Sequence, residues 1–319
     1  MRKLLLAAVV CACVLGAGAA WAAYPEQPIT LICPWQAGGG TDAVARIVAT
    51  LMQKELGVPV NVVNRTGGNG VIGHQAIISA KPDGYTIGIG SAELAMLHWM
   101  GLTDFTAKDF NPVAGVNLDL AAITVRTDGP WADYKALEAA IKANPGKLTA
   151  SGTAAGGCWH LALAMWLTAA GFKADDVRWI PSEGAAPAQQ ELMSGGIDMV
   201  TVSVPEVAAL VDAGKTKILA YMSEVRSTKY PEVPTLKELG IPVSTGTWRG
   251  IFAPMGVPGD IMKLLEATVS KVVKEKDFID FMNSRGLGIN YLPSKEFGAL
   301  VVKSDEEFGV AMKAAGLTK

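Results

Sequence analysis

The stretch Pro34-Trp35-Gln36-Ala37-Gly38-Gly39-Gly40-Thr41-Asp42 follows a short apolar run, residues 29–33, and precedes residues 43–56, where apolar side chains recur at helical spacing. This order predicts a strand that passes through glycines into a helix. The first turn of a helix leaves backbone N–H groups without partners and carries the positive end of the helix dipole. Three glycines let a ligand approach the backbone closely, and Thr41 or Asp42 can cap the helix. The stretch therefore predicts an anion-binding loop.

The same arrangement occurs again in the second half of the chain. Residues 147–151 are typical of a strand, Gly152-Thr153-Ala154-Ala155-Gly156-Gly157 of a loop, and a helix follows from about Cys158. Two anion-binding loops, one in each half of the chain, predict a ligand that is held from both sides.

Residues 1–22 are typical of a secretory signal peptide. Arg2 and Lys3 form a basic start, residues 4–15 an apolar centre, and Ala20-Trp21-Ala22 a cleavage site. A membrane anchor would need about 20 apolar residues, and this run is shorter. Lipidation within Val10-Cys11-Ala12-Cys13 would leave an unusually short apolar centre. We therefore expect a soluble protein that is exported to the periplasm.

Length and charge after cleavage bound the class of protein. Removal of 22 residues from 319 leaves 297, a length suited to two α/β lobes. The net charge of the whole chain is −2, and the signal peptide takes away two basic residues and no acidic ones, which leaves −4. This mild acidity, without basic runs, disfavours nucleic acid and anionic membranes as partners.

Two cysteines remain after cleavage, Cys33 and Cys158, and each adjoins one of the two glycine loops. An exported protein can form a disulfide. A bond between these two loops would hold the predicted cleft shut, however. We therefore expect two free, buried thiols.

Strand-like and helix-like segments alternate along the chain, which predicts an α/β fold with mainly parallel sheets flanked by helices. The predicted strands cover residues 29–33, 60–63, 86–89, 121–125, 148–151, 177–180, 199–202, 218–221 and 248–252. The predicted helices include residues 43–56, 158–170, 260–275, 277–283 and 295–314. The helix from Cys158 is apolar nearly all round, so we expect it to be deeply buried.

Motifs of enzymes and cofactor-binding proteins find little support. Gly68-Asn69-Gly70-Val71-Ile72-Gly73 has the glycine spacing of a dinucleotide site, but no acidic residue follows about 20 positions later at a strand end. We interpret it as a structural turn. There is no G-x-S-x-G stretch, and none of the three histidines stands at metal-ligand spacing from another His or Cys. The sequence therefore predicts no catalytic site, no metal and no cofactor.

Five residues near the loops and strand ends keep two interpretations each. Trp35 and Trp159 either pack in the core or form an apolar wall for a ligand. His160 is either a core histidine bonded to a nearby carbonyl or part of the cleft. Glu93 and Glu183 are either solvated or face an ammonium group of a ligand.

Many short motifs follow one another from residue 24 to the C-terminus. They are Tyr24-Pro25, Pro28-Ile29, residues 34–42, Val63-Asn64-Arg65-Thr66-Gly67-Gly68, residues 70–73, Lys81-Pro82-Asp83-Gly84-Tyr85-Thr86, Lys108-Asp109-Phe110, Ala143-Asn144-Pro145-Gly146-Lys147, His160-Leu161-Ala162, Gly184 with Pro187-Ala188, Gly195-Gly196-Ile197-Asp198, Arg226, Pro231-Glu232-Val233-Pro234-Thr235, Trp248-Arg249-Gly250 and Ala253-Pro254. In this order and spacing they resemble the substrate-binding receptors of tripartite tricarboxylate transporters, the extracytoplasmic solute receptors abundant in Bordetella and its relatives.

The resemblance implies a two-lobed, type II-like periplasmic-binding-protein fold. Residues 23–122 and 247–319 would form the first lobe and residues 123–246 the second, with a cleft that closes around a small carboxylate. Backbone N–H groups, hydroxyls and water would hold the carboxylate, rather than a dedicated arginine. We expect a monomer whose partners are this ligand and the permease subunits of a transporter.

Carried onto matching positions, the resemblance implies ligand contacts in both lobes. In the first lobe they are Gly38, Gly39, Gly40, Thr41, Asp42 and Ser91, and in the second Gly152, Thr153, Gly156, Gly157, Asp198 and Ser203. Trp35, Glu93, Trp159 and His160 complete the predicted ligand-binding set.

Two departures from the family pattern concern the charge of the ligand. Gly157 and Cys158 stand where many relatives carry Ser or Thr, and Ser182-Glu183-Gly184 replaces a frequent Tyr-Lys-Gly. Fewer hydroxyls and an acid in place of a lysine favour a monocarboxylate or an amino-acid-like ligand over a dicarboxylate.

The sequence thus predicts an exported solute receptor that delivers a small organic acid to a permease. One alternative is a sensor that presents its closed form to a signalling protein, since the same residues would serve it. A secreted hydrolase is the other, and it lacks a credible nucleophile–base pair.

Overall fold

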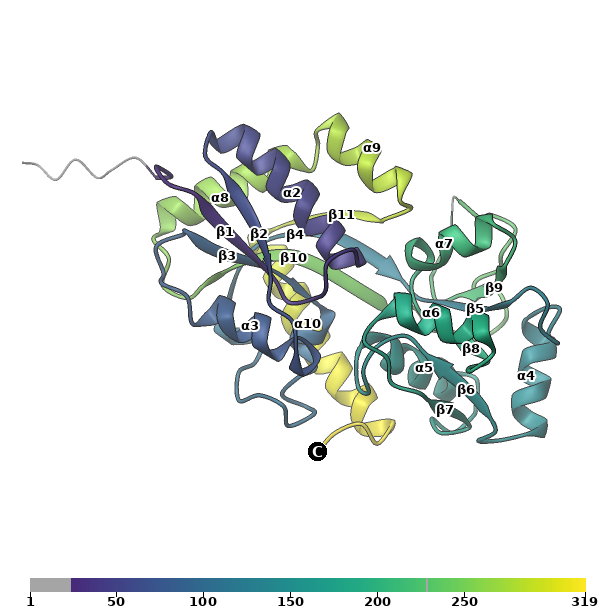
Figure 1. Ribbon diagram of the computed structural model, residues 1–319. Coiled ribbons are helices and arrows are strands. Elements are labelled where there is room, and N and C mark those ends of the chain that lie inside the picture. The colour runs from purple at the N-terminus through teal and green to yellow at the C-terminus, as the bar shows by residue number, and fades with distance from the viewer. Residues whose placement is uncertain (1–23, 228) are drawn as a thin grey trace, which may run out of the picture.

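The computed structural model describes residues 24–227 and 229–319, which form two lobes (Figure 1). The predicted signal peptide, residues 1–22, lies outside the described residues. The strands are β1 (Ile29–Cys33), β2 (Val60–Asn64), β3 (Thr86–Ser91), β4 (Phe110–Leu120), β5 (Ala122–Arg126), β6 (Leu148–Ser151), β7 (Val177–Trp179), β8 (Met199–Val200), β9 (Thr216–Tyr221), β10 (Gly246–Pro254) and β11 (Ile289–Pro293). The α-helices are α2 (Gly40–Leu56), α3 (Val71–Ile78), α4 (Tyr134–Ala143), α5 (Cys158–Ala169), α6 (Ala185–Ser194), α7 (Val204–Asp212), α8 (Gly259–Val272), α9 (Lys276–Ser284) and α10 (Ser294–Ala314). Short 3-10 helices are η1 (Gly68–Gly70), η2 (Ala92–Ala95) and η3 (Ala107–Asp109).

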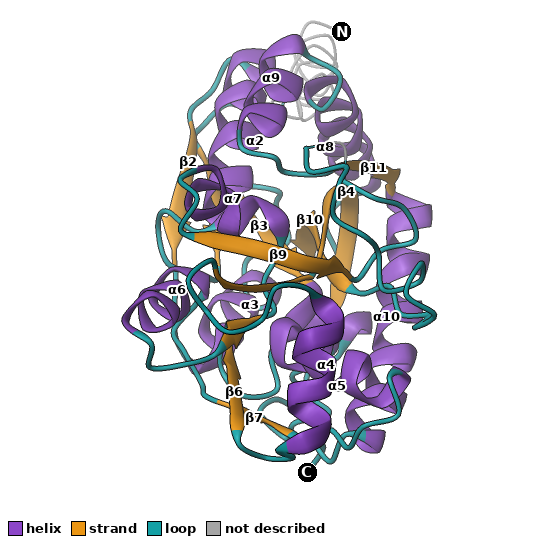
Figure 2. Ribbon diagram, turned by 90° about the vertical axis from the view of Figure 1, so that its right-hand side faces the viewer, coloured by secondary structure: helices purple, strands orange, loops and turns teal. Residues whose placement is uncertain are grey.

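Each lobe is built around one sheet. The first sheet has the strand order β11-β4-β10-β3-β1-β2 and the second β7-β6-β8-β5-β9. Strands β1, β2 and β3 pair in parallel, as do β6, β7 and β8. Helices α2, α8 and α9 lie at the end of the molecule that holds the first sheet, and α4 and α5 lie at the other end (Figure 2). The predicted two-lobed α/β fold is confirmed.

Antiparallel pairing is introduced where the chain passes between the lobes. Strand β10 lies antiparallel between β3 and β4, and β5 lies antiparallel between β8 and β9. The two crossings are side by side, because Leu120 pairs with Gly246 and the Ala121 N–H donates to the Thr245 carbonyl at 2.9 Å. The predicted lobe boundaries, after residues 122 and 246, fall at the first residues of β5 and β10.

Every strand predicted from the sequence is present, but β4 and β11 were not predicted. Strand β4 carries Asn111, Pro112, Asn117 and Asp119 among its apolar residues, so it does not read as an apolar run. Strand β11 is an edge strand whose residues are exposed or only partly buried. In both strands, pairing with neighbours distant in sequence decides the structure.

Helix α5 is deeply buried, as its apolar sequence predicted. Leu161, Leu163, Trp166 and Leu167 are fully covered, and the Trp166 indole N–H donates to the Tyr134 hydroxyl at 2.9 Å. Helix α10 contacts both β4 and α5, so it packs against both lobes. Among the described residues, no helix has the length and apolar character needed to cross a membrane.

Candidate ligand-binding site

A cavity of about 880 Å³ lies between the two lobes. The first lobe lines it with the loop before α2, the turn around η1, Glu93 and the side chains of Thr247 and Arg249 on β10. The second lobe contributes the loop before α5, the start of α5 itself, the segment that leads into α6, and one side of α7. Both glycine-rich loops predicted from the sequence therefore reach the same space.

The first loop opens α2 without a side-chain cap. Gly39 is the capping residue, in an extended conformation, and no side chain accepts a hydrogen bond from the first turn. The predicted cap by Thr41 or Asp42 is therefore wrong. The Thr41 hydroxyl accepts from Nε of Arg249 at 2.8 Å, and Oδ2 of Asp42 accepts from the Gly38 N–H and from Nε of Arg46, both at 2.9 Å.

The Asp42 carboxylate thus fixes the shape of the first loop. Burial opposes its ionisation, but hydrogen bonds from Arg46, Gly38 and Asn64 outweigh that and lower its pKa. The Gly38 N–H is occupied by this carboxylate, so the free donors lie further along, in the first turn of α2. The first turn, with Gly40 and Thr41, borders the cavity.

The second loop opens α5 in the same way. Gly157 is its capping residue, again without a side-chain cap. The Gly156 N–H donates to Nδ1 of His160 at 2.9 Å, and the His160 ring stacks on Trp179 with 4.7 Å between ring centroids. His160 therefore supports the loop from within the helix, and burial lowers its pKa to about 4.

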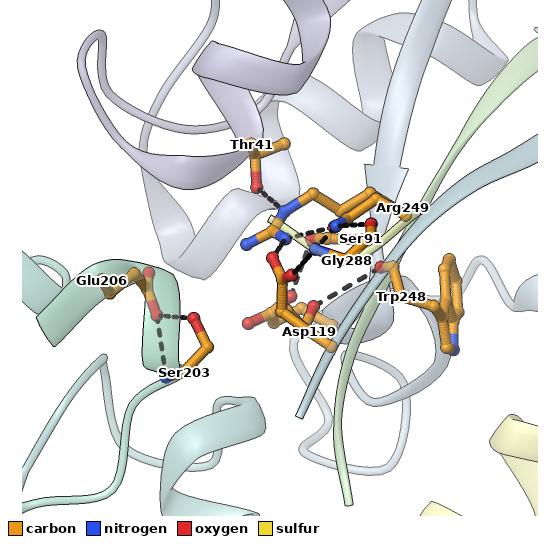
Figure 3. A network of polar contacts seen from close by, with 11 residues as sticks. Thr41, Ser91, Asp119, Ser203, Glu206, Trp248, Arg249 and Gly288 are labelled. Atoms are coloured by element: carbon orange, nitrogen blue, oxygen red, sulfur yellow. Dashed lines mark hydrogen bonds and ion pairs between the residues drawn. The ribbon is translucent and has the colours of Figure 1, made fainter. Parts of the chain in front are cut away.

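A buried guanidinium occupies the first-lobe side of the cavity (Figure 3). Arg249 is only 3% exposed, and its Nη1 donates to Asn117 and Asp119, each at 2.5 Å. Oδ1 of Asp119 accepts from the Gly288 N–H at 2.8 Å, which fixes the ion pair to the backbone. The Nη2 atom makes no hydrogen bond within the described residues and faces the start of α2, because a Cβ built on Gly40 would lie 2.9 Å from it.

Two acidic side chains line the cavity near this guanidinium. Glu206, in the first turn of α7, uses Oε2 to accept from the Ser203 N–H at 3.1 Å and the Ser203 hydroxyl at 2.7 Å. Burial raises the pKa of Glu206, and the charge of Arg249 opposes that rise. Glu93 is 3% exposed and accepts from the Ser91 hydroxyl at 2.7 Å.

Eight of the sixteen residues in the predicted ligand-binding set line the cavity: Trp35, Gly38, Gly39, Gly40, Thr41, Glu93, Thr153 and Trp159. The other eight do not line it: Asp42, Ser91, Gly152, Gly156, Gly157, His160, Asp198 and Ser203. Most of these stand directly behind the lining. Ser91, for example, accepts from the Trp35 indole and donates to Glu93.

Asp198 has a different role from the rest of that set. It precedes β8, and its Oδ2 accepts from the N–H and hydroxyl of Thr149 at 2.8 and 2.9 Å. Thr149 lies inside β6, whose far end leads to the glycine loop. The Asp198 carboxylate therefore ties β6 to β8 at the end of the sheet away from the cavity.

Sequence reasoning missed Arg249 and Glu206 as cavity residues. Ser203-Val204-Pro205-Glu206 has the spacing of a capping box, which predicts a helix start but not the direction of the second carboxylate oxygen. Arg249 lies between Trp248 and Gly250 in the mostly apolar strand β10. A charged residue at such a position was the signal in the sequence that could have indicated a functional side chain. Glu183, for which the sequence left two interpretations, is exposed and also lines the cavity.

Cys33 and Cys158 are free and buried, as predicted. Burial raises the pKa of the Cys33 thiol to about 11. Burial and, next to it, the negative charge of Glu93 raise the pKa of Cys158 well above its usual value. Within residues 24–227 and 229–319, no cluster of three or more His, Cys, Asp or Glu side chains is arranged to hold a metal.

The two lobes, the paired crossings and the cavity between the lobes define a two-lobed solute-binding protein. Residues 44–317 match the family described as "Tripartite tricarboxylate transporter family receptor". The chain belongs to this family, which confirms the resemblance predicted from the sequence. The family is one of solute-binding receptors rather than of enzymes.

Individual relatives agree with this assignment. "Protein BugT" of Bordetella pertussis is 32% identical over 269 residues, which cover 82% of this chain and 81% of BugT. The solved structure of a TctC solute-binding protein from Polaromonas is 39% identical, with a TM-score of 0.73 over 91% of this chain and 99% of that one. The structure of the periplasmic binding protein BugD is 28% identical, with a TM-score of 0.83 over 93% of this chain and 100% of that one.

Proposed function

We propose that the protein is a monomeric periplasmic receptor, without enzymatic activity, that closes around a small organic carboxylate and delivers it to the permease subunits of a tripartite transporter. The observation that carries the proposal is the open start of α2 at the interlobe cavity, where no side chain caps the helix. The start of α5 borders the same cavity from the other lobe. Uncapped helix starts stabilise anions through N–H groups and the helix dipole.

The proposed contacts combine both lobes. The N–H groups of Gly40 and Thr41 receive the carboxylate, Gly39 leaves room for its approach, and Thr153 faces it from the second lobe. Trp35 lines the cavity and gives the organic part of the ligand an apolar wall, whereas Trp159 is only 2% exposed and packs mainly in the core. The membership of a receptor family and the description of BugD as a periplasmic binding protein support the location.

The first prediction concerns close approach to the loop. A Cβ on Gly39 would meet only the Gln36 carbonyl, at 3.5 Å, so Gly39→Val fits the fold while filling the space where the carboxylate sits. We expect an affinity loss of about 100-fold, equal to about 2.8 kcal/mol. A thermal-shift screen of organic acids and amino acids identifies a ligand, which stabilises by about 2.7 kcal/mol at 100 times its Kd. Calorimetry then compares the variant with the wild type.

Gly259→Val is the matched control. Gly259 is the first residue of α8, and a Cβ there meets nothing within 4 Å. We expect this variant to bind like the wild type, and both variants to unfold at wild-type temperatures. Unchanged affinity in Gly39→Val would remove the loop from the site, and a screen without any carboxylate hit would contradict the proposed function.

The second prediction concerns closure. A ligand that bridges the lobes draws them together, and the strands at the two crossings absorb the rotation. Small-angle X-ray scattering is expected to give a smaller radius of gyration at saturating ligand than without it. Equal radii in the two states would argue against a closing cleft.

A further inference from the structure

The inner part of the cavity offers both an unused guanidinium N–H and unused carboxyl oxygens. Of the other charged residues that line the cavity, Lys229 is paired with Asp212, and Arg285 and Glu183 are exposed. Arg249 is already paired with Asp119, so this ion pair is neutral as a unit. Glu93 and Glu206 both line the same cavity, and neither forms an ion pair within the described residues. A site with a spare guanidinium N–H and two spare carboxyl groups is not complementary to a plain organic acid.

We propose that the receptor selects zwitterionic ligands, small amino carboxylates whose carboxylate is held by Arg249 and the start of α2 and whose ammonium group is held by Glu206 and Glu93. This inference rests on the proposed function, since it specifies the ligand class of the same cavity.

The carboxylate end of the ligand is assigned by the free donors. Nη2 of Arg249 points at the first turn of α2, where a Cβ on Gly40 would lie 2.9 Å away. Only glycine at this position leaves the guanidinium N–H and the helix start open to one anion. Arg249 itself is immobilised by hydrogen bonds to Thr41, Asn117 and Asp119. A prearranged donor of this kind loses little conformational entropy on binding.

The ammonium end is assigned by the free acceptors. Oε2 of Glu206 is used by Ser203, whereas Oε1 has no hydrogen-bond partner within the described residues and would lie 3.9 Å from the same Cβ on Gly40. Figure 3 shows Glu206 and Arg249 approaching this space from the two lobes. The buried Glu93 has one oxygen engaged by Ser91 and comes from the first lobe, so the two carboxyl groups flank the cavity.

A dicarboxylate would fare worse in this cavity. A second carboxylate placed between Glu93 and Glu206 would be repelled by like charges in a partly desolvated site. The exposed Arg285 of the lining would compensate only weakly, because solvent screens its charge. An ammonium group at the same place would instead neutralise a desolvated carboxylate. Because Glu206 belongs to the second lobe and Arg249 to the first, a zwitterion also links the lobes through its two ends.

The experiment compares acids that differ only in the amino group. Calorimetry measures the Kd of alanine and propanoate, of 4-aminobutanoate and butanoate, and of glutamate and glutarate. We expect at least one amino acid to bind more than tenfold tighter than its des-amino partner. Glu206→Gln retains an oxygen for Ser203, and it is expected to lower this ratio at least tenfold, without weakening the des-amino acid. Glu93→Gln is expected to act in the same direction.

Glu191→Gln is the matched control, because Glu191 is an exposed residue of α6 outside the cavity. It is expected to leave every Kd unchanged. Equal or tighter binding of the des-amino acids by the wild type, or a ratio that Glu206→Gln leaves unchanged, would overturn the zwitterion inference while the carboxylate receptor stands. If neither kind of acid binds, the proposed function itself fails.

Discussion

Replacing Asp119 by alanine is expected to lower the free energy of unfolding by about 3–5 kcal/mol, because it leaves the Arg249 guanidinium buried without its counter-charge. The Arg249 and Asp119 side chains are 4% and 1% exposed. Asp119 also accepts from the Gly288 N–H and the Asn117 amide, which lose a partner in the variant. Urea unfolding followed by circular dichroism measures the change.

Asp128→Ala is the control for this prediction. Asp128 pairs with Arg126, but its side chain is 82% exposed, so the expected cost is below about 1 kcal/mol. Adding Arg249→Met to Asp119→Ala is expected to recover part of the lost stability, since it removes the orphaned charge. A loss below about 1 kcal/mol in Asp119→Ala would show that water reaches this ion pair.

Acid is expected to destabilise the protein through His74 and His160. Burial lowers the pKa of each imidazole from 6.5 to about 4 in the folded state. Between these two pH values the histidines of the unfolded chain are protonated and those of the folded chain are neutral, so the free energy of unfolding decreases as pH falls from 6.5 towards 4. Each histidine contributes about 1.4 kcal/mol per pH unit across this window, which is about 3 kcal/mol for each of the two.

His74→Gln tests this contribution. His74 is fully buried and its Nδ1 bonds the Gly70 carbonyl at 2.9 Å, a bond that a glutamine amide can replace. Unfolding free energies of the variant and the wild type are measured at several pH values from 7 to 4. The variant is expected to lose about 1.4 kcal/mol less per pH unit than the wild type. Parallel curves would mean that folding does not lower the pKa of His74.

The sequence predicted the features that depend on local pattern. Short apolar strands such as β1 and β6, and the glycine-rich helix starts that follow them, are encoded within about ten residues. The antiparallel crossings are not, because β10 takes its place between β3 and β4 by pairing with strands far away in the chain. For the same reason Arg249 was recognisable as an unusual residue in a strand, but its hydrogen-bond partners Thr41, Asn117 and Asp119 could not be predicted.

The division of cavity residues follows the same logic. Backbone donors at a helix start point along the helix axis whatever surrounds them, so Gly39 and Gly40 were predictable. The direction of the Glu206 carboxyl depends on how α7 faces the first lobe. Asp42 was misjudged as a cap because its buried carboxylate instead accepts from the Gly38 N–H, Arg46 and Asn64.

The position of β10 also determines the order in which the lobes are completed. All strands of the second sheet come from the continuous segment 122–221, whereas β4 is joined to β3 in the first sheet only through β10, which lies between them. During synthesis, which starts at the N-terminus, the second lobe can therefore finish folding while the first sheet still lacks its inner strand β10. A chain truncated before residue 246 would keep the second sheet, but it would leave one edge of β3 and both edges of β4 unpaired in the first, because β11 also lies beyond that point. The lobe that starts the sequence is the one that the end of the sequence completes.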